Sequence, residues 1–517
     1  MAALPSVSLP SVSSRILNAN LEARIMSADD AAALIEFGTR IGMSGFTGSG
    51  YPKAVPMALA RRISDANLRG QKAQVSIFTG ASTGPELDGA LAKAGGIQLR
   101  LPYQSDPETR KRINAGEMEY MDIHLGHVAQ YVENGFLGKM DWALIEVTAI
   151  LEDGRLVPSS SVGNNRTWIE QAEKVILEVN ACQPAELEGM HDIYYGLQPP
   201  PNRQPIPLVH TGQRIGTPYL HVPLEKVAAV VLTDSPDRNS SFKAPDITSR
   251  LIAGHILEFL GWEVQKGRIP PSLLPLQSGV GNIANAVLFG LLEAQFENLT
   301  SYTEVIQDGM IELLRSGKLT CASATAFSLS PEVMEKVNAE MANYRERIVL
   351  RPQEISNHPE IIRRLGVIGM NGMIEADIYG NVNSTHVMGS RIQNGIGGSG
   401  DFARNGYLAI FMAPSTAQKG DITTIVPMVS HIDHTEHDVD VVVTEQGLAD
   451  LRGLSPRQRA KVIIEKCAHP DYRSLLRDYQ ERAERLSFGK HTPHLLHESL
   501  GWHDRYVRTG RMRPRQE

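Results

Sequence analysis

One carboxylate, that of Glu304, lies among apolar residues at a point where a strand should end in a loop. Its surroundings read Ser301–Met310 (SYTEVIQDGM), with Val305 and Ile306 directly after it. A carboxylate that loses water among such side chains is costly unless it is neutralised or used. We therefore interpret Glu304 as a nucleophile for acyl chemistry rather than as a structural acid.

Two glycine-bearing turns offer backbone N–H groups for such chemistry. The first, Gly279-Val280-Gly281-Asn282, lies upstream of Glu304, and four of the six residues in the second, Gly395–Gly400, are glycine. Because this conformational freedom is destabilising unless backbone must approach something closely, we predict ligand contact at the second turn. The first turn can equally be a plain connection from a strand to a helix.

The first turn also fits the G-x-G-x-x-A form of a dinucleotide-binding fingerprint, from Gly279 to Ala284. Glu304 then stands near the expected acidic position that binds ribose. A nicotinamide-dependent dehydrogenase is therefore an alternative, and a non-catalytic CoA- or nucleotide-binding module is another. In each case the helix N-terminus after the turn attracts anions.

Two further acidic segments have competing interpretations. The run Ser430–His437 (SHIDHTEH) has the composition of a metal cluster, but no second ligand group with recognisable spacing accompanies it. We therefore expect a hydrogen-bonded His/Asp loop and no metal site. Glu445 follows the apolar strand Val439–Thr444, where open α/β folds place functional loops, although it could also cap a helix.

The bulk composition describes an ordinary globular protein. The chain has 517 residues, which favours two large domains, with 42% hydrophobic and 21% charged residues. A formal charge of −7 and the lack of a Lys/Arg-rich run argue against nucleic acid as a partner. The three cysteines, Cys182, Cys321 and Cys467, lack metal-site spacing and fit a reducing compartment.

The sequence favours a cytoplasmic protein with no membrane partner, because no apolar run is long enough to span a bilayer. Residues 1–21 contain no acid, several serines and Arg15, which is faintly similar to a mitochondrial transit peptide. Pro5 and Pro10 interrupt any amphipathic helix there, and there is only one arginine.

Strand, glycine-rich turn and helix alternate along the chain, which is typical of an α/β fold. Residues 197–217 are rich in proline and polar residues, so we predict a surface excursion or linker. The pattern predicts strands at Thr39–Ser44, Ala73–Phe78, Trp142–Val147, Lys174–Val179, Leu273–Gln277, Leu299–Thr303 and Val439–Thr444. It predicts helices at Ala28–Phe37 and Ile283–Leu292, a third helix that begins near Pro52, and a fourth that follows the Glu304 loop and ends at Leu314.

The two halves have the pattern of diverged copies. Thr79-Gly80 followed by Asp88-Gly89 parallels Thr303-Glu304 followed by Asp308-Gly309. If a duplication produced them, the fold does not require a carboxylate at this position, since the first copy has Gly80. We predict two tandem open α/β domains, residues 1–225 and residues 226–517, with the nucleophile in the second.

Over nearly its whole length the chain resembles the acetyl-CoA hydrolase/transferase family of class I CoA-transferases, especially members of the succinyl-CoA:acetate type. The segments that carry this resemblance are Gly45–Gly48, Thr79–Pro85, Gln277–Asn282, Glu304–Gly309, Met370–Asp377, Gly395–Phe402 and Val443–Gly453.

The resemblance implies a role for each matching residue. Glu304 corresponds to the catalytic glutamate, and Val280 and Gly398 correspond to the backbone donors of an oxyanion hole. Glu445 matches a second active-site glutamate, and Arg238 and Asn357 match polar residues near the acyl and CoA sites. The implied CoA contacts are Gly279, Val280, Gly281, Asn282, Ile283, Ile374, Asn394, Gly398 and Lys419, the last standing one residue later than the lysine of similar proteins.

The implied activity is ping-pong transfer of CoA between succinyl-CoA and acetate, giving acetyl-CoA and succinate through a glutamyl-CoA thioester. The same site could instead hydrolyse acetyl-CoA. CoA takes part as substrate and no other cofactor is expected. The resemblance also implies a homodimer.

Overall fold

A computed structural model describes residues 14–239, 241 and 244–514, so residues 1–13 of the faint transit-peptide pattern lie outside the described residues. Contacts divide the chain into two compact units. Unit 1 comprises residues 1–241, 303–308 and 321–361, and unit 2 comprises residues 242–302, 309–320 and 362–517. The duplication boundary at residue 225 stays a prediction, because each unit also contains pieces from elsewhere in the chain.

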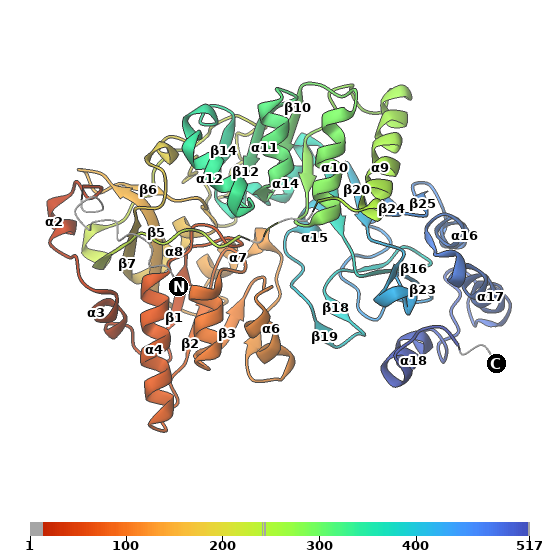
Figure 1. Ribbon diagram of the computed structural model, residues 1–517, viewed down its shortest axis with the longest axis horizontal. Helices are drawn as coiled ribbons and strands as arrows, with labels where there is room; N and C mark the ends of the chain where they lie inside the picture. Colours follow the sequence, from red (N-terminus) through yellow and green to blue (C-terminus); the bar gives the residue numbers. More distant parts are fainter. Residues whose placement is uncertain (1–13, 240, 242–243, 515–517) are drawn as a thin grey trace. The chain divides into compact units, whose positions relative to one another are not determined.

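The first sheet belongs to unit 1 and runs in the order β4-β3-β2-β1-β5-β7-β8, with β6 paired to β5. Figure 1 labels β1, β2, β3, β5, β6 and β7 of this sheet. All neighbours along this path are parallel, and only β6 is antiparallel. The strands are β1 (Arg40–Met43), β2 (Val75–Phe78), β3 (Ile97–Leu101), β4 (Glu119–Tyr120), β5 (Met140–Ile150), β6 (Leu156–Pro158), β7 (Ala172–Asn180) and β8 (Val227–Thr233).

Helices cover both faces of the first sheet. Ile41 and Met43 pack with α3 and α4 in one apolar cluster, so the intervening Gly42 faces the other way. There Trp168 of α8 lies over Gly42. The helices of unit 1 are α2 (Ala19–Glu22), α3 (Ala28–Ala33), α4 (Ala54–Leu68), α5 (Ala90–Lys93), α6 (Pro107–Asn114), α7 (Val128–Glu133), α8 (Asn165–Gln171), α12 (Pro331–Ala339) and α13 (Gln353–Ser356).

The second sheet runs in the order β14-β12-β10-β9-β15-β20-β24-β25. Only β25 among the registered pairs of this sheet is antiparallel. Strand β12 begins in unit 2 and ends in unit 1, where it pairs with β14. The strands are β9 (Leu276–Ser278), β10 (Leu299–Tyr302), β12 (Leu319–Ala324), β14 (Ile348–Leu350), β15 (Ile368–Gly372), β20 (Leu408–Met412), β24 (Val441–Thr444) and β25 (Gly447–Asp450).

The two sheets repeat one topology, which confirms the predicted duplication of an open α/β fold. Numbered in chain order, the strands of each sheet follow the path 4-3-2-1-5 and then continue outward. In this correspondence β2 matches β10. Gly80 and Glu304 each stand two residues beyond the end of these strands. The structure therefore places both residues at equivalent carboxyl ends, as the sequence predicts.

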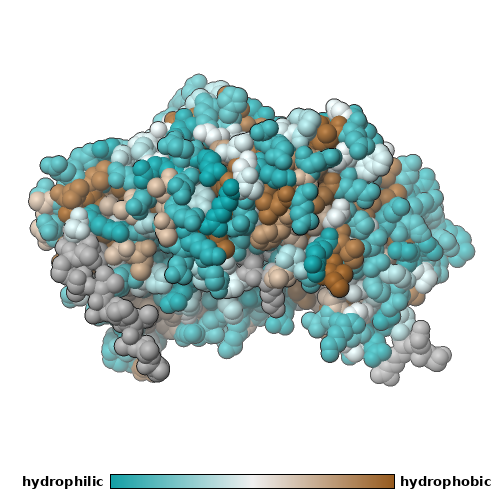
Figure 2. Space-filling view, turned by 45° about the horizontal axis from the view of Figure 1, so that its top comes forward, coloured by the Kyte–Doolittle hydropathy of each residue, from teal (hydrophilic) through white to brown (hydrophobic). Residues whose placement is uncertain are grey.

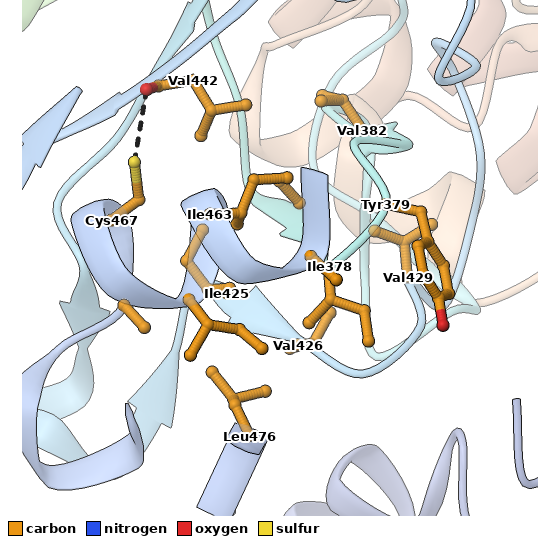
Figure 3. Packing of buried hydrophobic residues seen from close by; sticks show 14 of the residues in the cluster. Ile378, Tyr379, Val382, Ile425, Val426, Val429, Val442, Ile463, Cys467 and Leu476 are labelled. Atoms are coloured by element: carbon orange, nitrogen blue, oxygen red, sulfur yellow. Dashed lines mark hydrogen bonds between the residues drawn. The ribbon is translucent and has the colours of Figure 1, made fainter. Parts of the chain in front are cut away.

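Unit 2 adds an apolar core between its helices and a small second layer of strands (Figure 3). This core joins Val382, Ile425 and Val426 to Ile463 of α16 and Leu476 of α17, and the Cys467 thiol donates to the Val442 carbonyl oxygen at 3.3 Å. The remaining helices are α9 (Ile247–Gln265), α10 (Asn282–Glu293), α11 (Asp308–Arg315), α14 (Pro359–Leu365), α15 (Ser399–Asn405), α16 (Pro456–Cys467), α17 (Pro470–Leu486) and α18 (Gly501–Thr509), and the small strands include β16 (Glu375–Asp377), β17 (Val382–Asn383) and β23 (Ile425–Val426).

The visible surface is mostly hydrophilic, with apolar residues in small separate areas (Figure 2). Within the described ranges, no helix combines the length and apolarity needed to cross a membrane.

Residues 197–217 form a largely exposed, irregular surface excursion, as predicted, but the alternative prediction of a linker is wrong. Ile206, Leu208 and Thr211 are buried, and the whole segment belongs to unit 1. The buried Arg351 guanidinium donates to the Thr211 carbonyl oxygen at 3.2 Å and also to that of Gln213. These hydrogen bonds to the buried guanidinium hold this part of the proline-rich segment against unit 1.

We predict that Gly42→Ala destabilises the protein by about 1–3 kcal/mol, the usual cost of overpacking. A Cβ at Gly42 would lie 2.7 Å from a ring atom of the fully buried Trp168. Gly254→Ala, inside α9 with no atom within 4 Å of the added Cβ, is the matched control and should gain about 0.5–1 kcal/mol. Urea unfolding measures both changes, and equal stabilities for the two variants would contradict the packing described for α8.

Candidate functional site

The backbone around Glu304 is fixed within unit 1. Glu304 lies directly before the short strand β11 (Val305–Ile306), which pairs in parallel with β13 (Ala326–Phe327). Its carbonyl oxygen accepts hydrogen bonds from the N–H groups of Thr325 at 2.9 Å and Ala326 at 3.3 Å. These contacts fix the direction in which the side chain leaves the strand end.

The Glu304 carboxylate is buried and hydrogen-bonded to an amide. Only 9% of the residue is exposed, and the Asn357 Nδ2 group donates to Oε1 at 3.1 Å. Asn357 is fully buried at the end of α13, and its Oδ1 accepts from the Ser356 hydroxyl at 2.8 Å. Because Oδ1 is engaged in this way, the amide presents its donor face to Glu304.

An apolar cluster includes Val305, the residue directly after Glu304. It consists of Phe46, Ala81, Leu125, Val305 and Ala326, with Tyr103 packed against it. Burial, followed by the negative charge of Glu304, raises the pKa of the Tyr103 phenol to about 12. A wall of this kind limits water near the carboxylate.

Sequence reasoning did not assign Phe46, Ala81 or Tyr103 to the neighbourhood of Glu304. A signal existed, because the three residues follow the carboxyl ends of β1, β2 and β3, where open parallel sheets gather functional loops. Strand β3 was not among the predicted strands, so Tyr103 could not be placed.

Arg238 belongs to a loop of unit 1 that is bonded to the Gly48–Gly50 turn. Its neighbours anchor it: Asp237 accepts from the Gly50 N–H at 3.1 Å and from buried Lys53 at 3.0 Å. The Arg238 guanidinium itself is 55% exposed, and its Nε lies 3.0 Å from a carboxylate oxygen of Glu86. A fixed backbone therefore carries a partly exposed cation.

In unit 2, the first glycine turn leads from β9 into α10. The Gly279 N–H donates to the Met370 carbonyl oxygen at 2.9 Å, and Gly281 immediately precedes the helix with φ +146°. Residues with a side chain rarely adopt this φ, so the position favours glycine. Val280 is 55% exposed, and Asn282 and Ile283 form the first residues of α10.

The second glycine turn leads into α15. Gly397 has φ +60°, and Gly398 stands at the N-cap of the helix. The Asn394 amide before it donates to the Ser384 carbonyl oxygen at 3.2 Å. Ile374 is tied to the same region of unit 2, since its N–H donates to the Asn383 carbonyl oxygen at 2.8 Å.

Glu445 stands in the turn between β24 and β25, so the helix-capping interpretation is wrong; α16 begins later, behind its own cap Ser455. The Ser415 N–H donates to Glu445 at 2.7 Å, and the Ser415 hydroxyl and Gln446 amide also bind this carboxylate. Partial burial raises the pKa of Glu445, but these hydrogen bonds outweigh it and leave the pKa below its ordinary value.

Lys419 is exposed in the turn between β21 (Thr416–Ala417) and β22 (Ile422–Thr423), with φ +57°. The His/Asp loop is hydrogen-bonded, as predicted: Asp433 accepts from the Ser384 N–H at 2.7 Å and from the Thr385 hydroxyl at 2.9 Å. Among the described residues, no group of His, Cys, Asp or Glu has the arrangement of a metal site.

Within unit 1 the structure thus brings Glu304 and Asn357 into contact, while Arg238 binds Glu86. Within unit 2 it fixes the two glycine turns and Glu445. The roles of these residues in catalysis and CoA binding stay predictions at this point.

Solved structures share this fold. RipA from Yersinia pestis aligns with a TM-score of 0.69 at 22% identity, covering 89% of this chain and 97% of RipA. A 4-hydroxybutyrate CoA-transferase from Porphyromonas gingivalis aligns with a TM-score of 0.61 at 22% identity, covering 89% of this chain and 98% of that protein. At these identities the likeness shows the fold alone.

Curated relatives are much more similar in sequence. A succinyl-CoA:acetate CoA-transferase from Clostridium kluyveri is 52% identical over 96% of this chain and 92% of its own length. A propanoyl-CoA:succinate CoA transferase from Escherichia coli is 46% identical, covering 94% and 98%. An acetyl-CoA hydrolase from Schizosaccharomyces pombe is 47% identical, covering 94% and 96%.

Family models match both parts of the chain. The acetyl-CoA hydrolase/transferase N-terminal domain matches residues 12–232, and the C-terminal domain of the same family matches residues 334–480. Together with the fold and the relatives, these matches show that the chain belongs to the acetyl-CoA hydrolase/transferase family.

Proposed function

We propose that this protein transfers CoA between succinyl-CoA and acetate through a glutamyl-CoA thioester on Glu304. The observation that carries the proposal is the buried Glu304 carboxylate, held by Asn357 two residues beyond a strand end. The equivalent position in the first sheet is Gly80, so this fold forms without a carboxylate there. The similarity to the Clostridium kluyveri transferase supports the choice of substrates.

In the proposed first half-reaction, a Glu304 carboxylate oxygen attacks the thioester carbon of succinyl-CoA. The carbon–sulfur bond breaks, giving a mixed anhydride and the CoA thiolate. The thiolate then attacks the Glu304 carbonyl carbon, releases succinate and leaves the glutamyl-CoA thioester. Acetate attacks this thioester to form the acetyl anhydride and thiolate, whose recombination yields acetyl-CoA and restores Glu304.

Each attack develops negative charge on an oxygen, which preorganised N–H donors stabilise. We assign this role to the backbone of Val280 and Gly398, where glycine turns permit close approach. Glu445 is proposed as a second active-site glutamate, and Arg238 is proposed to bind the second carboxylate of the succinyl group or to orient Glu445. CoA is proposed to bind along Gly279–Ile283, Ile374, Asn394, Gly398 and Lys419. The proposed steps use CoA as substrate and need no metal or redox cofactor.

Acetyl-CoA hydrolysis is a second candidate, favoured by the Schizosaccharomyces pombe relative. Water would replace acetate as the acceptor at the same site. The apolar cluster next to Glu304 favours transfer, because it limits water near a reactive anhydride. The nicotinamide-dependent dehydrogenase interpretation has no support in the family matches.

A product assay separates these candidates. With succinyl-CoA and acetate, the transferase converts each succinyl-CoA to one acetyl-CoA, whereas the hydrolase accumulates free CoA.

We further propose that the protein is a cytoplasmic homodimer. Size-exclusion chromatography with light scattering tests the oligomeric state.

Glu304→Gln should lower CoA transfer by at least about 1,000-fold, because an amide cannot form the anhydride. The amide replaces the carboxylate nearly isosterically, so the melting temperature should change little. Steady-state rates on freshly purified protein, with mass spectrometry to exclude deamidation, measure the effect. Near-wild-type turnover of the intact variant would contradict the assignment of Glu304 as the nucleophile.

Gly398→Val should lower turnover by about 100–1,000-fold, the usual cost of losing an oxyanion donor, because the new side chain displaces the turn. Gly489→Val is the matched control, since Gly489 is exposed with no atom within 4 Å of an added Cβ. Its turnover should stay at the wild-type value. Unchanged turnover of Gly398→Val with an undisturbed turn in its crystal structure would assign the turn another purpose.

Arg238→Ala should slow the succinyl-CoA half-reaction by about 10-fold or more and the acetyl-CoA half-reaction far less. The reason is that only succinate carries a second carboxylate for a guanidinium to bind. Arg61→Ala, which removes a cation from the exposed Arg61–Asp29 ion pair, should leave both rates unchanged. Equal small effects of Arg238→Ala on both half-reactions would show that Arg238 is an ordinary surface residue that does not bind succinate.

A further inference from the structure

His434 is a buried histidine that the proposed reaction does not use. Only 2% of it is exposed, and its backbone exchanges two hydrogen bonds with Val382, at 2.8 Å and 3.0 Å. Val382 belongs to the apolar core of unit 2 (Figure 3). The imidazole also packs against Phe411, with ring centroids 4.6 Å apart. Both the backbone and the ring of His434 are therefore fixed by the core.

The imidazole reaches the glycine turn through one serine. His434 Nε2 lies 3.1 Å from the Ser399 hydroxyl oxygen, and that hydroxyl donates to the Ile396 carbonyl oxygen at 2.7 Å. A serine hydroxyl can donate only one hydrogen bond, and that of Ser399 goes to the Ile396 carbonyl oxygen. In its contact with His434, the Ser399 oxygen therefore accepts the hydrogen bond. In this arrangement His434 carries its proton on Nε2 and donates to Ser399, and Nε2 also lies 3.4 Å from the Ser384 hydroxyl oxygen.

Ser399 directly follows Gly398 and is the first residue of α15. Its bond to Ile396 closes the turn that contains Gly397, whose φ of +60° only a permissive backbone adopts readily. The residues just before the turn are also held by hydrogen bonds. The Asn394 amide and the Gln393 N–H donate to the carbonyl oxygens of the Ser384–Thr385 pair.

Ser384 and Thr385 are in turn bound by the residue next to His434. Asp433 accepts from the Ser384 N–H at 2.7 Å and from the Thr385 hydroxyl at 2.9 Å. One short segment, Asp433–His434, therefore holds both sides of the second glycine turn. This gives the His/Asp loop of the sequence a purpose other than metal binding.

We propose that His434 is a positioning residue that fixes the Gly398 backbone donor through Ser399. The inference deepens the proposed function and rests on the oxyanion role assigned to Gly398. A glycine-rich turn without this support samples many orientations, so a donor there would be aligned for only part of the time. Loss of the contact should therefore slow the chemical step while leaving CoA affinity nearly intact.

The test uses the full-length protein and succinyl-CoA in single-turnover reactions, with the covalent CoA adduct measured by intact mass. His434→Phe keeps a ring against Phe411 and removes the donor, and Ser399→Ala removes the acceptor. Each should lower the rate of adduct formation by about 10–100-fold, with the dissociation constant for CoA changed by less than about threefold. The double variant should be little slower than the slower single variant, because the contact between His434 and Ser399 is already lost in each single variant.

Rescue separates positioning from general structural damage. His434→Gln keeps an N–H donor near the place of Nε2 and should restore the rate to within about fivefold of wild type. His434→Asn, whose amide is too short to reach Ser399, should stay slow. If glutamine rescues no better than asparagine, the inference is wrong.

The outcomes also separate this inference from the proposed function. If the wild type forms no adduct with succinyl-CoA, the proposed function fails and the inference fails with it. If the wild type forms the adduct and Ser399→Ala forms it at the same rate, the inference alone is wrong. Ser399→Ala decides the question in this way even if His434→Phe does not fold.

Discussion

Burial of the Glu304 carboxylate is the constraint on which the local structure depends. Removing a carboxylate from water costs several kcal/mol unless donors replace the lost solvent. Here the Asn357 amide supplies one such donor, and the N–H groups of Thr325 and Ala326 hold the backbone that carries the side chain. The neutral amide of Asn357 replaces part of the hydration that the carboxylate loses.

The two sheets show how one topology serves two purposes. In the first sheet, the position equivalent to Glu304 cannot hold a side chain, since a Cβ at Gly80 would lie 2.8 Å from the Gly45 carbonyl oxygen. The carboxyl ends of strands in the first sheet instead supply Phe46, Ala81 and Tyr103 to the apolar cluster that includes Val305 next to Glu304. Divergence after duplication has therefore given the first sheet the apolar wall and the second sheet's strand end the carboxylate.

Much of this arrangement could be predicted from the sequence, because it depends on local pattern. The strand end before Gly80 follows from the apolar run Val75–Phe78, and the turns at Gly281 and Gly397 follow from glycines that positive φ requires. A carboxylate between a strand end and the apolar pair Val305–Ile306 marks Glu304 without any comparison.

The missing parts depend on contacts distant in sequence. Asn357 was assigned only through family resemblance, because nothing near residue 357 indicates that its amide meets Glu304. Composition also misplaced part of the proline-rich segment, where Thr211 is buried because Arg351 donates to its carbonyl. His434 gained a role only when the fold brought it to Ser399.

The most direct test of the covalent mechanism is the mass of the intact protein after incubation with succinyl-CoA alone. The account predicts an adduct of the mass of CoA less one water, which peptide mapping locates on Glu304 and which acetate discharges as acetyl-CoA. Full turnover to acetyl-CoA with no adduct detectable under rapid quenching, or an adduct on another residue, would contradict it.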